Sequence, residues 1–375
     1  MKIFYWSPFT SNVATIKAVI NSAYGLKKIY NHKTTLVNSV GEWNNLKKEI
    51  YSKKISLTQE NYKLSFKNID GYLKSRISFL IIFFKSYYYL KKLLIKEKPD
   101  YLVIHLITSL PIILFFMNKF KTKLILRISG YPKLTFFRKL LWKLGSKSIK
   151  FVTVPTIDTK KILEKEKIFD VKKVFFLPDP ILEENLRKKK KNIIVKNFIL
   201  NIGRLTYQKN QELLIRSFYY ISKKYKNIKL VILGKGEKYD DLIKITKDLN
   251  LSDKVIFPGH VKNVDDYINN SLCVVVSSLY EDPGFVMIES SNLKKTVICS
   301  DCPNGPKEFY KNGKNGFLFK NNSSHSLINT FEKFMKTSKK VINKKIKINY
   351  INSKKYSINY HSKLFNKLLK NYETV

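Results

Sequence analysis

The chain has 375 residues, enough for two domains with separate cores, and its hydrophobic (44%) and aromatic (14%) contents are those of a folded protein. Its 71 Lys and Arg against 28 Asp and Glu give a formal net charge of +43, which attracts nucleic acid, anionic lipid or phosphorylated substrates. An AT-rich genome would also enrich lysine, and both explanations stay open. Three cysteines (Cys273, Cys299, Cys302) and scattered histidines favour neither a disulfide framework nor a metal site.

The first half of the chain predicts strands that alternate with helices. The expected strands are Lys2–Trp6, Tyr101–Leu106, Lys123–Ile128 and Phe151–Val154, and the expected helices are Val13–Tyr24 and Arg76–Lys96. Continuous apolar strands of this kind are typical of a parallel sheet covered by helices on both faces. The apolar stretch Tyr101–Met117 contains His105 and Pro111, so it predicts a buried strand and a helix rather than a membrane span.

A change of composition divides the chain. Pro178-Asp179-Pro180 and the basic run Arg187–Lys191 interrupt the pattern, which predicts a first domain over residues 1–178 and a basic linker over 179–196. We expect a second domain over residues 197–350 and a C-terminal helix over 351–375 that packs back on the first domain. The strands expected in the second domain are Phe198–Ile202, Lys229–Leu233, Val255–Phe257, Cys273–Val276 and Thr296–Cys299. The sequence thus predicts an α/β protein of two doubly wound, Rossmann-like domains facing across a ligand-binding cleft.

One candidate binding loop follows the strand Phe198–Ile202. Its sequence is GRLTYQKN, from Gly203 to Asn210, and an amphipathic helix begins near Gln211. Asn210 is a favourable helix N-cap, which would place Arg204 and Lys209 beside a helix N-terminus. Backbone N–H groups and two cations there would form an anion pocket suited to a diphosphate. A solvated basic loop is the alternative in a chain so rich in lysine.

A second candidate loop follows the strand Cys273–Val276 and reads SSLYEDPGFVMIE. Pro283-Gly284 predicts a type II turn with positive φ at the glycine, leading into a helix that begins near Phe285. Glu281 would then lie on a cleft loop and Glu289 one turn inside the helix. One carboxylate could accept hydrogen bonds from sugar hydroxyls and the other from a ribose. Two surface glutamates are the alternative, which the scarcity of acidic residues disfavours.

In their order and spacing these segments resemble the retaining glycosyltransferases of family four, of the bacterial surface-polysaccharide or lipid-linked-glycan type, which have the GT-B architecture. The resemblance covers nearly the whole chain and is strongest from Gly203 to Phe319. It includes the two loops above, LVILGKG, FPG, SDCPNGPKE and NGKNGFLF. Two features depart from the family pattern. Asp282-Pro283 replace a small and an aromatic residue, and Ser11-Asn12 replace a glycine pair in the first loop.

The resemblance also implies roles for individual residues. Arg204 and Lys209 would hold the diphosphate of the donor in place of a metal ion, Glu281 would bond the donor sugar and Glu289 the ribose. Backbone N–H groups of Gly284, Phe285 and Val286 would assist, and the strand end Phe257–Val261 would border the base. His105 would contact the transferred sugar; a buried histidine satisfied by the backbone is the alternative. The implied catalytic residues are Glu281, His105, Arg204 and Lys209.

The resemblance implies a transferase that moves a hexose or N-acetylhexosamine from a uridine diphosphate (UDP) sugar to a membrane-associated glycan or glycolipid, for instance in lipopolysaccharide synthesis. No cofactor or metal is expected beyond this donor. The apolar run after Lys2 is too short for a signal peptide, which predicts a cytoplasmic enzyme. Aromatic residues and lysines in Phe79–Lys96 predict docking on the anionic inner face of the membrane. A sugar-nucleotide epimerase and a basic nucleic-acid-binding protein are the alternatives, although no nucleic-acid-binding signature occurs.

Overall fold

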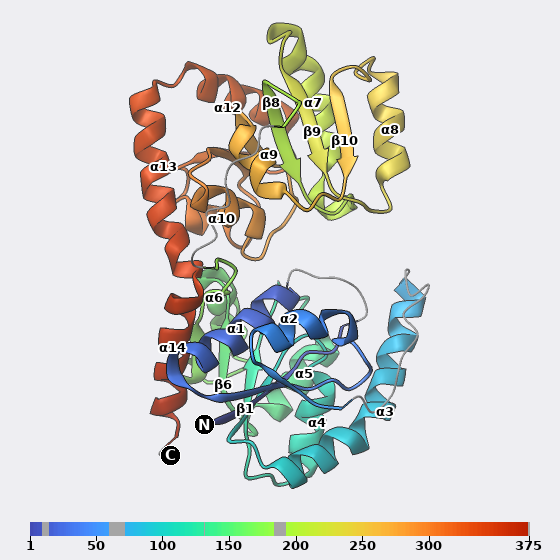
Figure 1. Cartoon of the computed structure of the whole chain (residues 1–375), viewed down its shortest axis with the longest axis vertical. Coiled ribbons are helices and arrows are strands. Elements are labelled where there is room, and N and C mark those ends of the chain that lie inside the picture. The colour runs from blue at the N-terminus through green and yellow to red at the C-terminus, as the bar shows by residue number, and fades with distance from the viewer. Residues whose placement is uncertain (10–14, 60–71, 131, 184–192, 374–375) are drawn as a thin grey trace. The chain divides into compact units, whose positions relative to one another are not determined.

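The computed structural model describes residues 1–9, 15–59, 72–130, 132–183 and 193–373, with the side chains of residues 72–79 excluded. The chain forms two compact units, which are coloured by residue number in Figure 1. The first unit contains Met1–Glu183 and Tyr356–Val375, and the second contains Glu184–Lys355. Each unit encloses one parallel sheet, so the predicted α/β class with two doubly wound domains is confirmed.

The sheet of the first unit has seven parallel strands in the order β3-β2-β1-β4-β5-β6-β7. The strands are β1 (Lys2–Trp6), β2 (Lys33–Leu36), β3 (Ser56–Leu57), β4 (Tyr101–Ile104), β5 (Lys123–Arg127), β6 (Ile149–Val154) and β7 (Val174–Phe176). The sequence predicts β1, β4, β5 and β6. It does not reveal the other three because they are short and lie toward the sheet edges, where no long apolar run is required.

Helices cover both faces of this sheet. Phe4 and Trp6 of β1 belong to one core, and the alternate residues Ile3 and Tyr5 belong to the other, as the two-residue period of a strand requires. The first core is covered by α3 (Tyr72–Glu97), α4 (Ser109–Met117), α5 (Phe136–Gly145) and α6 (Ile157–Lys165). The second core is covered by α1 (Thr15–Tyr30), α2 (Lys47–Ser52) and α14 (Ile358–Asn371).

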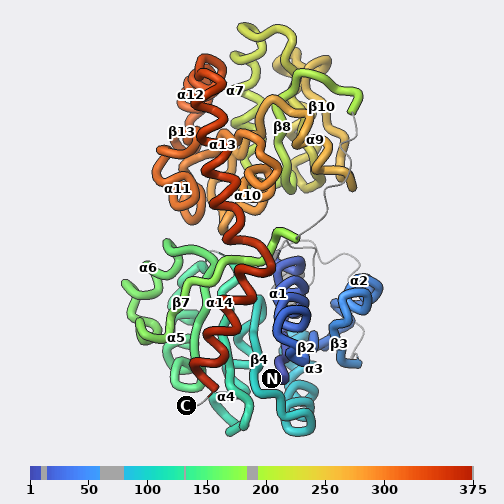
Figure 2. The backbone as a smooth tube through the Cα atoms, turned by 60° about the vertical axis from the view of Figure 1, so that its left-hand side comes forward, coloured from blue at the N-terminus to red at the C-terminus, as the bar shows by residue number. Residues whose placement is uncertain are grey.

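The C-terminal helix α14 lies alongside α1 in the first unit (Figure 2). The two helices approach so closely that a Cβ on Gly25 would lie 2.1 Å from Ser362 Oγ. His361 Nδ1 donates to the carbonyl of Pro178 at 2.7 Å, so its Nε2 accepts from the hydroxyl of Ser22 at 2.9 Å. Burial lowers the pKa of His361 to about 3, and the ring is therefore neutral at physiological pH.

The boundaries of the units differ from the predicted ones. Asp179, which was expected in the linker, is buried in the first unit and binds Arg127 Nη2 at 2.5 Å. The basic run Arg187–Lys191 lies outside the described residues. Residues 351–355, expected in the returning helix, belong to the second unit, in which α13 (Lys339–Ser353) ends. The return to the first unit therefore begins at Tyr356.

The second unit has six parallel strands in the order β10-β9-β8-β11-β12-β13. The strands are β8 (Phe198–Ile202), β9 (Lys229–Leu233), β10 (Val255–Gly259), β11 (Cys273–Val276), β12 (Val297–Ser300) and β13 (Phe317–Phe319). Their main core packs against α7 (Gln211–Lys224), α8 (Tyr239–Asp248) and α12 (Ser324–Lys336), while α10 (Phe285–Asn292) contacts β11, β12 and α13. The remaining helices are α9 (Val264–Asn270) and α11 (Pro306–Phe309). Of these six strands, all but β13 are predicted from the sequence.

Each sheet has one point at which the strand order reverses, between β1 and β4 and between β8 and β11. The loops after the two strands at such a point diverge and leave room for a ligand at the carboxyl edge of the sheet. In the second unit these loops are residues 203–210 and 277–284, and they contain Arg204, Lys209 and Glu281. In the first unit His105 directly follows β4. The topology thus places four predicted site residues at the two switch points.

Candidate functional site

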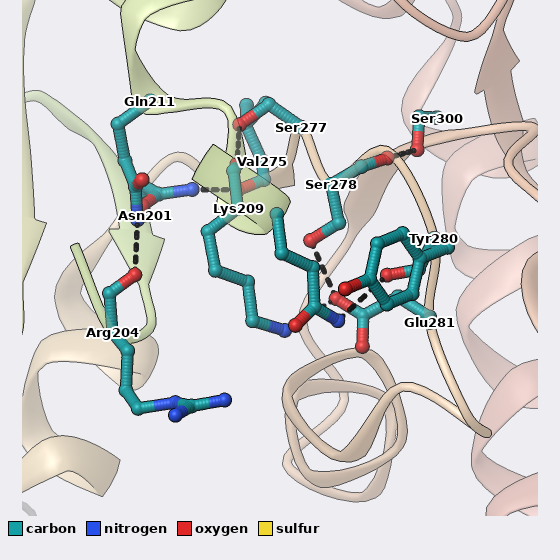
Figure 3. Close-up of polar contacts among 11 residues, drawn as sticks. Asn201, Arg204, Lys209, Gln211, Val275, Ser277, Ser278, Tyr280, Glu281 and Ser300 are labelled. Carbon is teal, nitrogen blue, oxygen red and sulfur yellow. Dashed lines mark hydrogen bonds and ion pairs between the residues drawn. The ribbon is translucent and has the colours of Figure 1, made fainter. Parts of the chain in front are cut away.

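The two loops at the switch point of the second unit are bonded to each other along their length (Figure 3). Leu279 N–H donates to the carbonyl of Gln208 at 2.8 Å, and Gln208 Nε2 donates to the carbonyl of Tyr280 at 3.0 Å. Ser277 Oγ donates to the carbonyl of Lys209 at 2.9 Å. Because all three bonds reach a backbone carbonyl, they fix the path of one loop relative to the other.

Lys209 and Glu281, predicted on separate loops, are in direct contact. Lys209 Nζ lies 2.6 Å from Glu281 Oε1, and Ser278 Oγ donates to the same oxygen at 2.5 Å. The side chain of Glu281 is only 8% exposed and that of Lys209 is 18% exposed. A carboxylate so well buried needs a cation and hydrogen bonds to offset its lost hydration. The structure provides both at one oxygen atom.

Arg204 is the exposed cation of the same loop. Its carbonyl accepts a hydrogen bond from Gln211 Nε2 at 3.0 Å, which holds the loop against the start of α7. Figure 3 shows the side chain extending from the loop, and its guanidinium has no ion pair among the described residues. A guanidinium in this state can form two parallel hydrogen bonds with a phosphate group. The predicted anion-binding role therefore fits its position.

Two glycines in the loop after β9 allow that loop to pack against the backbone on either side of Arg204. Gly234, at the end of β9, has φ of +138°, and a Cβ there would lie 1.8 Å from the carbonyl oxygen of Gly203. A Cβ on Gly236 would lie 2.2 Å from the carbonyl oxygen of Leu205. In addition, Leu205 N–H donates to the carbonyl of Lys235 at 3.0 Å. Backbone packs directly on backbone here, so a side chain at position 234 would displace the loop.

The segment that leads into α10 agrees with prediction in part. Gly284 has the expected positive φ, 96°, and α10 begins at Phe285 as expected. The peptide bond between Asp282 and Pro283 is cis, which the predicted type II turn did not anticipate. Glu289 lies half-buried on α10, and Gly284, Phe285 and Val286 form its N-terminal end.

Two further residues differ from or extend the prediction. Asn210 occupies the position before α7, but it is left-handed, with φ of 51°, and makes no capping bond to the helix. Its Nδ2 donates instead to Asn322 Oδ1 at 3.0 Å, so the predicted N-cap is wrong. Val261 lies half-buried just after β10, whose last residue Gly259 accepts a hydrogen bond from Gly234 N–H at 2.9 Å. The predicted base-binding segment thus adjoins the glycine-supported loops.

His105 is buried in the first unit, with 5% of its surface exposed. Its Nδ1 is 3.0 Å from Ser129 Oγ, whereas its Nε2 has no hydrogen-bond partner among the described residues. Burial, reinforced by the charge of Arg127, lowers the pKa of His105 well below its usual value, so the ring is neutral. The ring lines a small cavity together with Thr153 and His361. Its partner is thus a side chain rather than the backbone, and its contact with a sugar stays a prediction.

The cysteines show no arrangement for metal or redox chemistry. Cys299 and Cys302 are buried free thiols, and burial raises the pKa of Cys302 to about 12. Within the ranges that the structure describes, no group of three or more His, Cys, Asp and Glu side chains is placed to hold a metal ion.

Comparison with known proteins finds a family model that covers these loops. Residues 183–349 match the family described as glycosyl transferases group 1. This match covers nearly all of the second unit. An uncharacterized glycosyltransferase of Methanocaldococcus jannaschii is 35% identical over 249 residues, which cover 60% of this chain and 61% of that protein.

A second relative has a named reaction. The N-acetylgalactosamine-N,N'-diacetylbacillosaminyl-diphospho-undecaprenol 4-alpha-N-acetylgalactosaminyltransferase of Campylobacter jejuni is 28% identical over 229 residues. The match covers 58% of this chain and 62% of that protein. The matched part of the chain therefore spans about three fifths of the length of each of these two relatives.

A solved structure matches the whole chain. HepE of Anabaena, crystallised in complex with UDP, has a TM-score of 0.74 at 14% identity, and the match covers 99% of this chain and 100% of HepE. The likeness shows that both units together have the GT-B fold, as the sequence resemblance implied.

The sequence pattern does not reveal four polar residues that hold the site together. They are Gln208, Gln211, Ser277 and Ser278, and the motifs predict no role for them. Gln208 and Ser277 bond backbone carbonyls of the opposite loop, and Gln211 bonds the Arg204 carbonyl. Ser278 bonds the Glu281 carboxylate within its own loop. Their only signal in the sequence is their nearness to Lys209 and Glu281. The contacts of Gln208 and Ser277 join segments about seventy residues apart, and those of Gln211 and Ser278 depend on how each loop folds.

We expect Gly234→Ala to destabilise the second unit by about 3 kcal/mol or more, because the new Cβ meets the Gly203 carbonyl and the φ suits glycine alone. Gly259→Ala is the matched control: its φ is also positive, at 75°, but a Cβ there meets only the flexible Lys235 side chain, at 3.7 Å. Its expected cost is about 1 kcal/mol. Denaturant unfolding measures both, and equal losses would contradict the role assigned to Gly234.

Proposed function

We propose that the protein is a retaining glycosyltransferase, which moves a sugar from a nucleoside diphosphate to a hydroxyl group of a glycan or lipid-linked acceptor. The observation that carries this proposal is the contact of Lys209 with Glu281, beside the exposed Arg204, at the switch point of a group 1 domain. The two cations suit the diphosphate of such a donor, and the hydrogen-bonded carboxylate suits the hydroxyls of its sugar.

In the proposed reaction, the bond between the anomeric carbon and the diphosphate oxygen breaks, and the acceptor oxygen bonds to the same face of that carbon. The acceptor proton passes to the departing phosphate oxygen, so no separate base is needed. Negative charge grows on the diphosphate, and Arg204 and Lys209 are placed to stabilise it. Glu281 would orient the donor sugar through its hydroxyls, Glu289 would bind the ribose, and backbone N–H groups at residues 284–286 would assist. The segment ending at Val261 would border the base, and His105 would contact the transferred sugar.

The donor and acceptor classes rest on the relatives. HepE was crystallised with UDP, which supports a UDP-sugar, either a hexose or an N-acetylhexosamine. The Campylobacter jejuni relative carries diphospho-undecaprenol in its name, which supports a lipid-linked acceptor for this chain as well. A cytoplasmic enzyme peripheral to the inner face of the cell membrane would meet both substrates.

Exposed apolar side chains in the first unit support docking at an anionic membrane surface. On α3, Phe84 and Tyr88 are 70% and 79% exposed, and lysines adjoin them. On α5, Phe136 and Phe137 are 74% and 79% exposed, beside Arg138. Both helices cover the same face of the sheet. Aromatic side chains suit the interfacial layer of a bilayer, and each nearby lysine adds about 1 kcal/mol at an anionic surface. No helix among the described residues is long and apolar enough to cross a membrane.

A thermal-shift screen against nucleotide sugars and free nucleotides tests the proposal, followed by product analysis with and without acceptor. A ligand at 100 times its Kd stabilises by about 2.7 kcal/mol, which such a screen detects. Conversion of the donor sugar without any acceptor would favour an epimerase. Salt-sensitive binding to random DNA without binding of any nucleotide sugar would favour a nucleic-acid-binding protein.

Lys209→Ala and Glu281→Ala should each reduce turnover by about 10²–10³, because each removes a contact to the donor. The loss should be the same for every acceptor. Lys244→Ala, which alters an exposed lysine of α8, is the control and should retain normal turnover. Circular dichroism should report folded protein for all three variants. Near-normal turnover in the first two would show that the site is misassigned.

The product should keep the anomeric configuration of the donor, and transfer should proceed in excess chelator. Retention follows from same-face attack, in which the leaving phosphate takes the proton. Metal independence follows if Arg204 and Lys209 supply the positive charge. NMR of the product from an α-linked donor decides both points. A β-linked product would overturn the mechanism, whereas loss of activity in chelator would overturn only the role of the two cations.

The protein should sediment with anionic vesicles at low salt and be released as the salt concentration rises. The double variant Phe84→Ser, Tyr88→Ser should bind several-fold more weakly, because it removes exposed aromatic area without altering charge. Tyr220→Ser removes an aromatic side chain of the second unit that is 58% exposed, and it should bind normally. Equal binding to neutral and anionic vesicles, or no binding at low salt, would contradict docking through this face.

A further inference from the structure

We propose that Ser278 is a positioning residue, which fixes the direction of the Glu281 carboxylate so that its second oxygen faces the donor sugar. This inference rests on the proposed function for the identity of the ligand. The orientation itself follows from contacts within the second unit.

The bonds to Glu281 are unequal between its two oxygens. Lys209 Nζ, at 2.6 Å, and Ser278 Oγ, at 2.5 Å, both bind Oε1. Among the residues that the structure describes, no donor binds Oε2. Figure 3 shows this second oxygen pointing away from Ser278, with no dashed line to it. The arrangement therefore assigns one oxygen to the protein and leaves the other for a ligand hydroxyl.

Ser278 is itself held rigidly. It is 1% exposed, and its carbonyl accepts a hydrogen bond from Ser300 Oγ, at the end of β12, at 2.6 Å. The next residue, Leu279, donates its N–H to Gln208 at 2.8 Å and accepts at its carbonyl from Asn321 Nδ2 at 2.9 Å. The hydroxyl of Ser278 thus projects from backbone that three other segments anchor.

Lys209 alone would fix Glu281 less well. An ammonium group is a compact charge on a flexible stem, which attracts a carboxylate without defining its rotation. The terminal torsion of a glutamate is broad, so the carboxylate turns easily unless a directional bond holds it. The Ser278 hydroxyl supplies that bond from a short side chain. Since Lys209 is also proposed to bind the diphosphate, Ser278 is the partner that keeps Glu281 in place when Lys209 engages the donor.

The test compares Ser278→Ala with wild type in three measurements: turnover of the UDP-sugar, Kd for UDP alone, and a crystal structure of each protein. A hydrogen bond to a charged group is worth enough to change kcat about tenfold to a hundredfold. We expect kcat to fall by that factor. The Kd for UDP should stay within about twofold, because UDP has no sugar for Glu281 to orient. The Glu281 carboxylate should turn or adopt several orientations in the variant crystal.

Two further variants keep the inference falsifiable. Ser222→Ala removes a buried hydroxyl of α7 that donates to the Tyr219 carbonyl of the same helix, and it should retain wild-type kcat. Ser278→Cys keeps the shape of the side chain with a weaker donor, so it should lose activity even if Ser278→Ala fails to fold. Wild-type kcat in folded Ser278→Ala or Ser278→Cys would overturn the inference. A parallel loss of UDP binding would also overturn it, because that result indicates a merely structural serine.

The crystal structures separate this inference from the proposed function. If wild type transfers no sugar and binds no UDP, the proposed function fails. The orientation of the Glu281 carboxylate in the crystal structures then decides the positioning role. A carboxylate that keeps its orientation in the Ser278→Ala crystal would overturn the role, and one that turns would support it.

Discussion

The reversal of strand order between β8 and β11 is the constraint on which the site depends. Because β8 and β11 are parallel, their carboxyl ends lie at the same edge of the sheet. At the reversal, the loops that follow them diverge, and neither connection fills the space between them. The segments that hold Lys209 and Glu281 are therefore neighbours in space although 72 residues separate them. The contact between Lys209 and Glu281 is possible only because the two loops lie side by side.

Burial of a single carboxylate then organises the side chains. Glu281 is 7% exposed in a chain with a formal net charge of +43, and excess positive charge elsewhere does not offset its loss of hydration. Only donors within hydrogen-bond distance do so, and Lys209 and Ser278 provide them. The same bonds orient the carboxylate. Stability of the loop and readiness of the site for a ligand thus have one physical cause.

The first unit uses buried polar groups differently. Neutral His361 links α14 to α1 and to the Pro178 carbonyl, and the pair of Arg127 with Asp179 holds the segment that follows β7. These contacts explain why residues 179–183, which follow Pro178 and include Pro180, belong to this unit and not to a free linker. Composition indicated a break in the chain there, but composition does not reveal a buried ion pair.

The sequence by itself determined the two α/β domains, the central strands and the residues at their carboxyl ends, because buried parallel strands require continuous apolar runs that are visible locally. It also placed Arg204, Lys209, Glu281 and Glu289 on loops and a helix where the structure has them. Tertiary structure alone decided that Lys209 and Ser278 share one oxygen of Glu281, that Asn210 bonds Asn322 instead of capping α7, and that His105 is buried against Ser129. The contacts of Lys209, Asn210 and His105 join segments far apart in the chain. Ser278 is only three residues from Glu281, but it shares the oxygen that Lys209 binds from another loop. Such arrangements depend on how the sheet brings strand ends together rather than on any local pattern.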